Sequence, residues 1–217
     1  MQTERDYYEF WEKSWNDEDV DDLSRWLEGW DRSTDDELEL LKSLGVKRVC
    51  DAACGFGAHT LAFASNGFDV SAFDVSSRAV ELTTAGLRKY GHFSVEVKTA
   101  EITDTGYADG SFDAAAAYAV LDHLTEADAR RALNELFRIT KADGYVLLSF
   151  DSAEEEDYLC PHELLPDGSM LYKDDTPRAG MLFRPCGDEL ISTLTDGYRV
   201  IHRRMNRKGD RIVLLQR

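Results

Sequence analysis

The sequence predicts an α/β fold, in which a mostly parallel sheet carries helices on both faces and ends in an antiparallel hairpin. Short apolar segments alternate with helical segments up to residue 150, which is typical of parallel strands joined by crossover helices. Two of these apolar segments end in an aspartate, and a glycine-rich loop follows the first. The last two strand-like segments flank the polar run NRKGD at 206–210, which suits a hairpin turn.

The first forty residues are expected to form an N-terminal helical lid, ahead of a main domain at 41–217. All four tryptophans lie in this first part. Tyr8, Trp11 and Trp15 follow the spacing of one helix face, and Trp26 and Trp30 follow that of another. Two interpretations stay open for these aromatic faces: plain packing against the main domain, or a cover over a bound ligand, which Tyr8 and Trp11 would then contact.

The main domain is expected to alternate strands and helices in chain order. Phe93, Val95 and Val97 alternate with polar residues, which predicts a strand. Apolar residues from Ala129 to Phe137 recur at helical spacing, which predicts a helix with one buried face. Strands are expected at 49–52, 69–74, 93–98, 112–118, 145–150, 198–204 and 211–216, and helices at 58–66, 77–90, 127–140 and 188–194.

Residues 151–186 depart from this pattern. They are polar and rich in proline, and they are too long for a simple connection. Asp167-Gly168 can turn a small hairpin that ends at 170–172. We interpret this segment as a substrate-facing insertion, with His162, Tyr172 and Arg184 as candidate substrate contacts.

The overall charge argues against nucleic acid as a partner. The 217 residues include 25 Lys and Arg against 42 Asp and Glu, a formal net charge of −17, which would repel a phosphate backbone. No apolar segment is long enough for a membrane span, and the N-terminus lacks a secretory signal, so no membrane partner is expected. Four cysteines without zinc-site spacing suit reduced thiols and predict no metal site. We expect a cytoplasmic monomer or homodimer.

The glycine loop after the first strand predicts a site for a nucleotide-like cofactor. Gly55 and Gly57 allow backbone N–H groups to approach a ligand closely. A dinucleotide site would place a third small residue where Thr60 stands, and Asp51 at the strand end would repel a pyrophosphate by about 4 kcal/mol at an effective dielectric of 20. A cofactor with an ammonium and a sulfonium would be attracted instead, and S-adenosyl-L-methionine (SAM) has both.

Asp74 ends the second strand, where a carboxylate can accept both hydroxyls of a ribose. The alternative role for Asp74 is to cap the helix that starts after it, and the two roles are compatible.

Four motifs in order resemble those of the class I SAM-dependent methyltransferases. The run DAACGFG at 51–57 resembles the family's acidic glycine loop, with Ala53 in place of the first glycine, a mild departure. Asp74 matches the family's ribose acid, AEI at 100–102 stands at the family spacing before DGSFD at 109–113, and YAVLDHL at 118–124 resembles the segment under the methionine part. The resemblance is greatest to the small-molecule branch, which includes quinone-ring methyltransferases.

This resemblance implies a Rossmann-like, mostly parallel seven-stranded sheet and a set of cofactor contacts. Val75 would lie beside the adenine, and Glu101 would bind the adenine amino group, where an aspartate is commoner. The implied cofactor-binding residues are Asp51, Ala53, Gly55, Gly57, Asp74, Val75, Glu101, Ile102 and Tyr118.

The chemistry expected is an in-line transfer of a methyl group to an O, N, S or C atom of a small molecule. A general base is needed only where the acceptor starts protonated, and His123 is the candidate because it follows the fourth strand. A helix-start histidine bonded to the backbone is the other interpretation. Two other functions remain open: a SAM-binding protein without turnover that acts through a protein partner, and a nicotinamide oxidoreductase, against which Asp51 and Thr60 argue.

Overall fold

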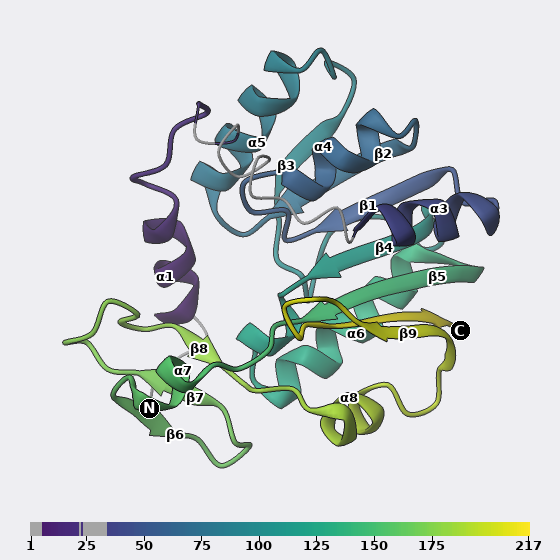
Figure 1. Ribbon diagram of the computed structural model, residues 1–217. Helices are drawn as coiled ribbons and strands as arrows, with labels where there is room; N and C mark the ends of the chain where they lie inside the picture. The colour runs from purple at the N-terminus through teal and green to yellow at the C-terminus, as the bar shows by residue number, and fades with distance from the viewer. Residues whose placement is uncertain (1–5, 22, 24–33) are drawn as a thin grey trace.

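The computed structural model describes residues 6–21, 23 and 34–217, so the predicted helix around Trp26 and Trp30 lies outside the described residues. A seven-stranded sheet runs through the molecule in the order β3-β2-β1-β4-β5-β10-β9 (Figure 1). Its strands are β1 (Arg48–Ala52), β2 (Asp69–Asp74), β3 (Glu96–Thr99), β4 (Phe112–Tyr118), β5 (Thr140–Phe150), β9 (Arg199–Met205) and β10 (Arg211–Gln216). β1 to β5 pair in parallel, whereas β10 is antiparallel to both β5 and β9. The predicted fold class is confirmed.

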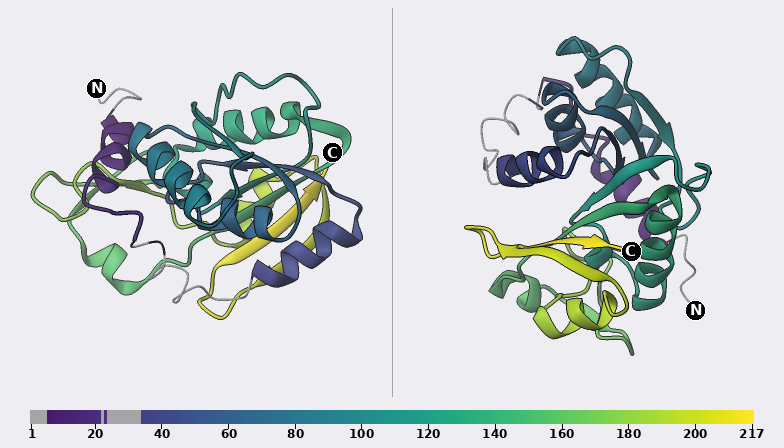
Figure 2. Two further views of the ribbon diagram at one scale, coloured as in Figure 1. Left: turned by 90° about the horizontal axis from the view of Figure 1, so that it is seen from above. Right: turned by 90° about the vertical axis from the view of Figure 1, so that its right-hand side faces the viewer.

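Helices lie on both sides of this sheet, as the two views in Figure 2 show. The described helices outside the insertion are α1 (Asp6–Ser14), α3 (Asp35–Ser43), α4 (Ala58–Ser65), α5 (Ser77–Lys89), η2 (Leu121–His123), α6 (Glu126–Ile139) and α8 (Asp188–Leu194). Alternate residues of β10 face opposite layers: Val213 and Leu215 pack with α6 and α8, whereas Ile212 and Leu214 pack with α3 and α4. This two-sided burial explains why the central strands read as continuous apolar runs.

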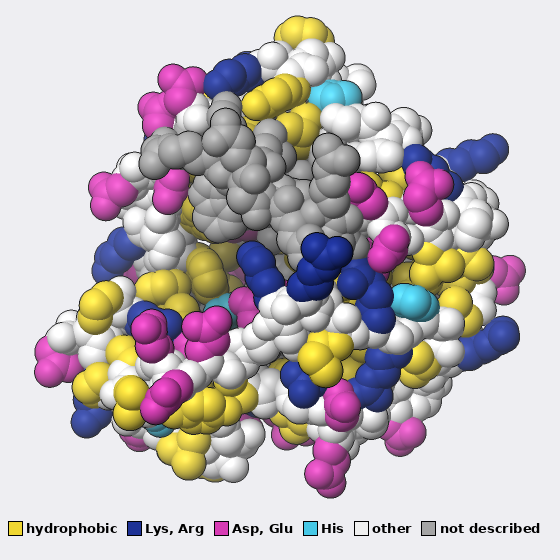
Figure 3. Space-filling view, viewed as in Figure 1, with side chains coloured by type: hydrophobic (Ala, Val, Ile, Leu, Met, Phe, Trp, Pro, Cys, Tyr) yellow, Lys and Arg dark blue, Asp and Glu magenta, His cyan; other side chains and the backbone are white. Residues whose placement is uncertain are grey.

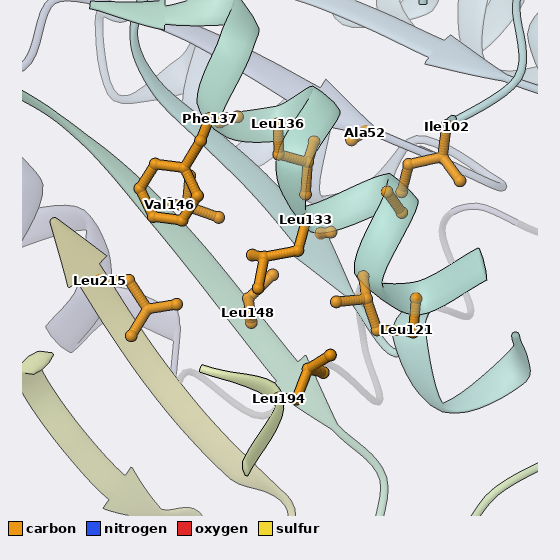
Figure 4. Packing of buried hydrophobic residues seen from close by; sticks show 14 of the residues in the cluster. Ala52, Ile102, Leu121, Leu133, Leu136, Phe137, Val146, Leu148, Leu194 and Leu215 are labelled. Carbon is orange, nitrogen blue, oxygen red and sulfur yellow. The ribbon is translucent and has the colours of Figure 1, made fainter. Parts of the chain in front are cut away.

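The larger core cluster fills the layer between α6 and the sheet. Figure 4 shows Leu133, Leu136 and Phe137 of α6 beside Val146 and Leu148 of β5. All five side chains are at most 3% exposed. Burial of a side chain of this size contributes about 1.5–3 kcal/mol, so this layer fixes the position of the loops that leave β4 and β5.

The insertion forms a small lobe with its own sheet. It contains α7 (Glu155–Leu159) and the antiparallel strands β6 (His162–Leu164), β7 (Met170–Tyr172) and β8 (Leu182–Phe183). Hydrophobic side chains reach the surface of this lobe in Figure 3, and Tyr158, Leu159 and Leu164 are exposed there. The backbone N–H of Arg184 donates to the carbonyl of Asp122, which joins the lobe to η2, the helical turn that follows β4.

Two strands start several residues away from the predicted position. β3 starts at Glu96, because Phe93 is 77% exposed and takes no part in the sheet. β5 starts at Thr140, directly after α6, whereas the prediction leaves residues 141–144 between the helix and the strand. Within the described residues, no helix combines the length and the hydropathy that a membrane crossing requires.

Candidate active site

A cavity of about 780 Å³ opens at the carboxyl ends of β1, β2, β4 and β5. This is where open α/β sheets bind their ligands, and the size is that of a small-molecule site. Side chains from the strand tips form its floor, while α1, the small lobe and the β9–β10 hairpin form its walls. Its lining contains ten of the predicted site residues, namely Tyr8, Trp11, Asp51, Ala53, Gly55, Asp74, Val75, Ile102, Tyr118 and His123.

Asp51 is a buried carboxylate at the tip of β1. It is 2% exposed, and its Oδ2 accepts the hydroxyl proton of Thr60 at 2.5 Å. No lysine or arginine of the described chain forms an ion pair with it. Burial raises the pKa of Asp51 to about 7, although the Thr60 bond lowers it. Such a group is poised to accept a cationic ligand.

The glycines of the loop have the positive φ angles that the sequence predicts, but the φ angle of Ala53 differs from expectation. Gly55 has φ of 51° and Gly57 has φ of 84°. Ala53 also has a positive φ, 54°, so its departure from glycine is not mild: an L-residue is strained there. A Cβ on Gly55 would lie 3.0 Å from the Trp15 ring, and one on Gly57 would lie 2.6 Å from Thr83. Both glycines are therefore required by close packing as well as by φ.

Asp74 lies at the tip of β2 and faces the same cavity. Its Oδ2 accepts the N–H of Gly55 at 2.8 Å and its Oδ1 accepts the N–H of Ser76 at 2.9 Å. Burial raises the pKa of Asp74, and those backbone N–H groups lower it. Ser76, rather than Asp74, caps α5 through its bond from the N–H of Ala79. Each carboxylate oxygen keeps a lone pair for a ligand hydroxyl.

His123 lies at the other end of the cavity, in η2. Its Nδ1 donates to the carbonyl oxygen of Leu182 at 2.9 Å, because a carbonyl can only accept. In the neutral ring, Nε2 therefore carries the lone pair. The ring is 8% exposed, with Trp11 edge-on to it at a centroid distance of 5.0 Å and Phe183 at 5.5 Å. This is a backbone-bonded histidine, and its free nitrogen remains available for proton transfer.

Trp11 and Trp15 lie at opposite ends of the cavity. Trp11 contacts His123 at one end, and Trp15 lies against Gly55 and stacks on Phe56 at the other, with ring centroids 6.1 Å apart. We expect the cofactor at the end beside the glycine loop and the acceptor at the end beside His123, and we call these the cofactor end and the acceptor end.

Several predicted residues lie outside the lining. Glu101 is exposed, although its neighbours Ala100 and Ile102 line the cavity. Tyr172 is 1% exposed and its hydroxyl donates to the carbonyl of Asp157, inside the small lobe. His162 packs edge-on against Tyr172, and Arg184 is 2% exposed with Nη1 4.0 Å from Glu126. The structure does not bring these side chains, or Gly57, to the cavity wall.

Two residues at the acceptor end were missed as site residues. Asp151 follows β5 directly, and Asp122 precedes His123. Asp151 could have been found by the signal that identified Asp51 and Asp74, an acid at the end of an apolar strand segment. His59 also lines the cavity, and it stacks on Tyr118 with ring centroids 3.5 Å apart.

The part of the chain with the glycine loop and the parallel strands is similar to known methyltransferases. A family model described as a methyltransferase domain matches residues 50–148. The chain is 33% identical over 102 residues to demethylmenaquinone methyltransferase of Clavibacter sepedonicus, which covers 47% of this chain and 40% of that protein. It is 33% identical over 125 residues to tRNA (carboxymethyluridine(34)-5-O)-methyltransferase of Arabidopsis thaliana, covering 55% of this chain and 27% of that protein. The chain thus spans less than half the length of these two relatives.

A solved structure extends the likeness to the whole fold. The 1,6-didemethyltoxoflavin-N1-methyltransferase of Burkholderia thailandensis, solved with 1,6-didemethyltoxoflavin and S-adenosylhomocysteine, superposes with a TM-score of 0.68 and 16% identity. The match covers 100% of this chain and 91% of that one. At this level of identity the likeness shows the fold.

Proposed function

We propose that the chain is a class I SAM-dependent methyltransferase and that it transfers the methyl group of SAM to a small-molecule acceptor. One observation carries the proposal. Asp51 is a fully buried carboxylate without a cationic partner in the described chain, beside a glycine loop with positive φ. A ligand with an ammonium group supplies the missing charge.

The residues at the cofactor end suit this ligand. Asp51 would attract the ammonium of the amino-acid part, and Asp74 would accept the ribose hydroxyls. Val75 and Ile102 offer apolar contacts for the adenine ring, and Glu101 stays our proposal for its amino group. When bound, the cofactor supplies a methyl group on a cationic sulfur. Ala53 and Gly55 bring the backbone close to the ligand, and Tyr118 closes the floor beside His59.

At the acceptor end, we propose that His123 takes a proton from the acceptor. Its Nδ1 is held by Leu182, so the ring presents Nε2 for that step. Residues 1–40 act as a lid in this proposal, since Tyr8 and Trp11 of α1 line the cavity and exclude water. Orientation of two reactants in a closed site contributes roughly 7–11 kcal/mol to such a reaction.

Two properties support a small-molecule acceptor over a nucleic acid. The net charge of −17 opposes a phosphate backbone, and α1 covers the cavity. The relation to a quinone-type methyltransferase agrees with this choice. We place the protein in the cytoplasm, because the four cysteines are all unpaired, and we expect a monomer or homodimer.

The test is calorimetry with SAM and with S-adenosylhomocysteine. Both should bind the wild-type protein, and Asp74→Ala should abolish binding. Asp69→Ala is the matched control, because Asp69 is an exposed carboxylate at the opposite end of the same strand. Failure of the wild-type protein to bind either compound would exclude the proposed function.

A further inference from the structure

The acceptor end of the cavity carries a cluster of three side chains: Asp122 and His123 from η2, and Asp151 from the end of β5. One potential ligand atom of each lies within 4.8 Å of those of the other two. The parallel pairing of β4 with β5 brings the two loops together. His123 and Asp151 line the cavity, and Asp122 lies behind them.

This cluster has excess negative charge. Asp122 is 0% exposed; its Oδ2 accepts the N–H of Asp151 at 2.8 Å, and its Oδ1 has no partner within the described chain. In the described ranges, neither Asp122 nor Asp151 forms an ion pair with a lysine or arginine. Asp210 adds a further negative charge, and burial, followed by Asp122 and Asp210, raises the pKa of Asp151.

The nearby cations do not balance this charge. Arg178 lines the cavity, but it pairs with Asp157 and packs over Tyr172. Lys208 lies on the hairpin between β9 and β10 with an exposed side chain, where water screens it. The cluster therefore lacks a positive partner, and a ligand can provide one.

Building on the proposed function, we propose that the methyl acceptor is a primary or secondary amine, which binds as its ammonium against Asp151, with the charge of Asp122 behind it, and loses a proton to His123. Nε2 of His123 takes one N–H proton and leaves a neutral amine with a free electron pair. That pair forms the new N–C bond as the C–S bond breaks, and the electrons of the broken bond stay on sulfur. The product is an N-methylammonium, and His123 returns its proton to water.

The charge at each stage favours an amine over a hydroxyl acceptor. An amine enters as a cation, reacts as a neutral group and leaves as a cation, so the carboxylates stabilise it before and after transfer. They also stabilise the positive charge that develops on nitrogen in the transition state. A phenol or acid would have to become an anion beside two carboxylates, which costs energy at short distance and low dielectric.

The test measures amine preference in the protein loaded with S-adenosylhomocysteine. A panel of matched amine and alcohol pairs of increasing size, from methylamine and methanol to benzylamine and benzyl alcohol, is titrated and followed by NMR. We expect the fitting amine to bind about tenfold to hundredfold more tightly than its alcohol, as for a charge-assisted hydrogen bond. Asp151→Asn should reduce this preference to about twofold, since the amide keeps the shape but loses the charge.

The control is Asp174→Asn, which removes an exposed carboxylate of the small lobe and should leave the preference unchanged. Turnover with radiolabelled SAM should give methylated amines and no methylated alcohols. Equal binding of amines and alcohols, or a preference that survives Asp151→Asn, overturns this inference while cofactor binding upholds the proposed function. Activity that is lost with a chelator and restored by Mg²⁺ or Mn²⁺ also overturns it, because the cluster would then hold a metal. Absence of cofactor binding overturns both.

Discussion

The hydroxyl of Thr60 donates to the buried carboxylate of Asp51 at 2.5 Å and thereby joins the first turn of α4 to the tip of β1. Thr60 stands where a dinucleotide site would have a small residue, so the same side chain argues against a pyrophosphate and orients the acid. The bond lowers the pKa of Asp51, but desolvation is larger and sets it at about 7. In the proposed function, the ionised form of Asp51 favours cofactor binding, whereas the protonated form favours the stability of the free protein.

The first prediction concerns the pH dependence of cofactor affinity. Binding of an ammonium requires the ionised form of Asp51, whose pKa is about 7 in the free protein. The association constant for S-adenosylhomocysteine should be constant at high pH and should fall by up to about tenfold per pH unit below 7. Calorimetry between pH 5 and 8.5 measures this, and an affinity that stays level across the range would contradict the role of Asp51.

The second prediction is that Asp51→Asn stabilises the free protein while it weakens cofactor binding. A carboxyl whose pKa is raised on folding contributes stability at low pH, below its unfolded pKa, and this contribution is lost as pH rises through about 7. At pH 8 the amide avoids the cost of a buried charge, so the free energy of unfolding should rise by about 1–3 kcal/mol. Urea unfolding at pH 8 tests this. The exposed Asp69→Asn should show no change, and a destabilised Asp51→Asn protein would refute the argument.

The third prediction concerns the strained backbone at Ala53. Its φ of 54° costs an L-residue about 1–2 kcal/mol, which glycine avoids. The greater freedom of glycine in the unfolded chain offsets part of this gain. Ala53→Gly should therefore raise the free energy of unfolding by about 0.5–1 kcal/mol. Its neighbour Ala52, buried in β1, provides the contrast, because Ala52→Gly should lower stability.

The fourth prediction assigns different roles to two tryptophans. Trp11 contacts His123, and Trp15 lies against Gly55. Trp11→Ala should raise the KM of the acceptor and leave the Kd of S-adenosylhomocysteine within about twofold, whereas Trp15→Ala should weaken the cofactor by about tenfold, as expected for loss of a buried aromatic contact. Steady-state kinetics and calorimetry on both variants separate the two effects. Equal effects of both changes on both ligands would show that the segment acts only by general packing.

The fifth prediction concerns a network away from the cavity. Glu135 of α6 accepts the hydroxyl and N–H of Thr105 and pairs with Arg138, which keep its pKa at about 2 against the opposing effect of burial. This stability is present above the usual glutamate pKa and is lost as pH falls towards 2. Glu135→Gln should lower the free energy of unfolding at pH 7 by about 1–3 kcal/mol. In α3, the exposed pair of Glu39 with Lys42 should contribute less than about 0.5 kcal/mol, so Glu39→Gln serves as the control.

Much of the fold could be predicted because its signals are local. β2, β4 and α8 have the predicted bounds, since each combines a clear apolar period with a turn at its end. β3 was predicted too early because Phe93 continues the alternation, yet this side chain is exposed and only a tertiary contact could have excluded it. Likewise, no pattern in the sequence indicates that Thr140 already pairs with Phe112.

One end of the candidate site could be predicted from the sequence, and the other could not. The cofactor end follows from strand tips and a glycine loop, so Asp51, Asp74 and Val75 could be predicted to share one cavity. The acceptor end depends on the small lobe, whose folding turns Tyr172 inward and leaves Phe183 at the cavity. A polar, proline-rich sequence does not show which of its side chains face inward.

The strand order carries a consequence for biosynthesis. β10 is the last strand in the chain, yet it lies inside the sheet, with β5 on one side and β9 on the other. While the ribosome still holds residues 211–216, the edge of β5 is open and β9 has no neighbour to pair with. The sheet of the nascent domain therefore stays incomplete until β10 emerges. During this interval, a chaperone would prevent the open strand edges from pairing with another chain.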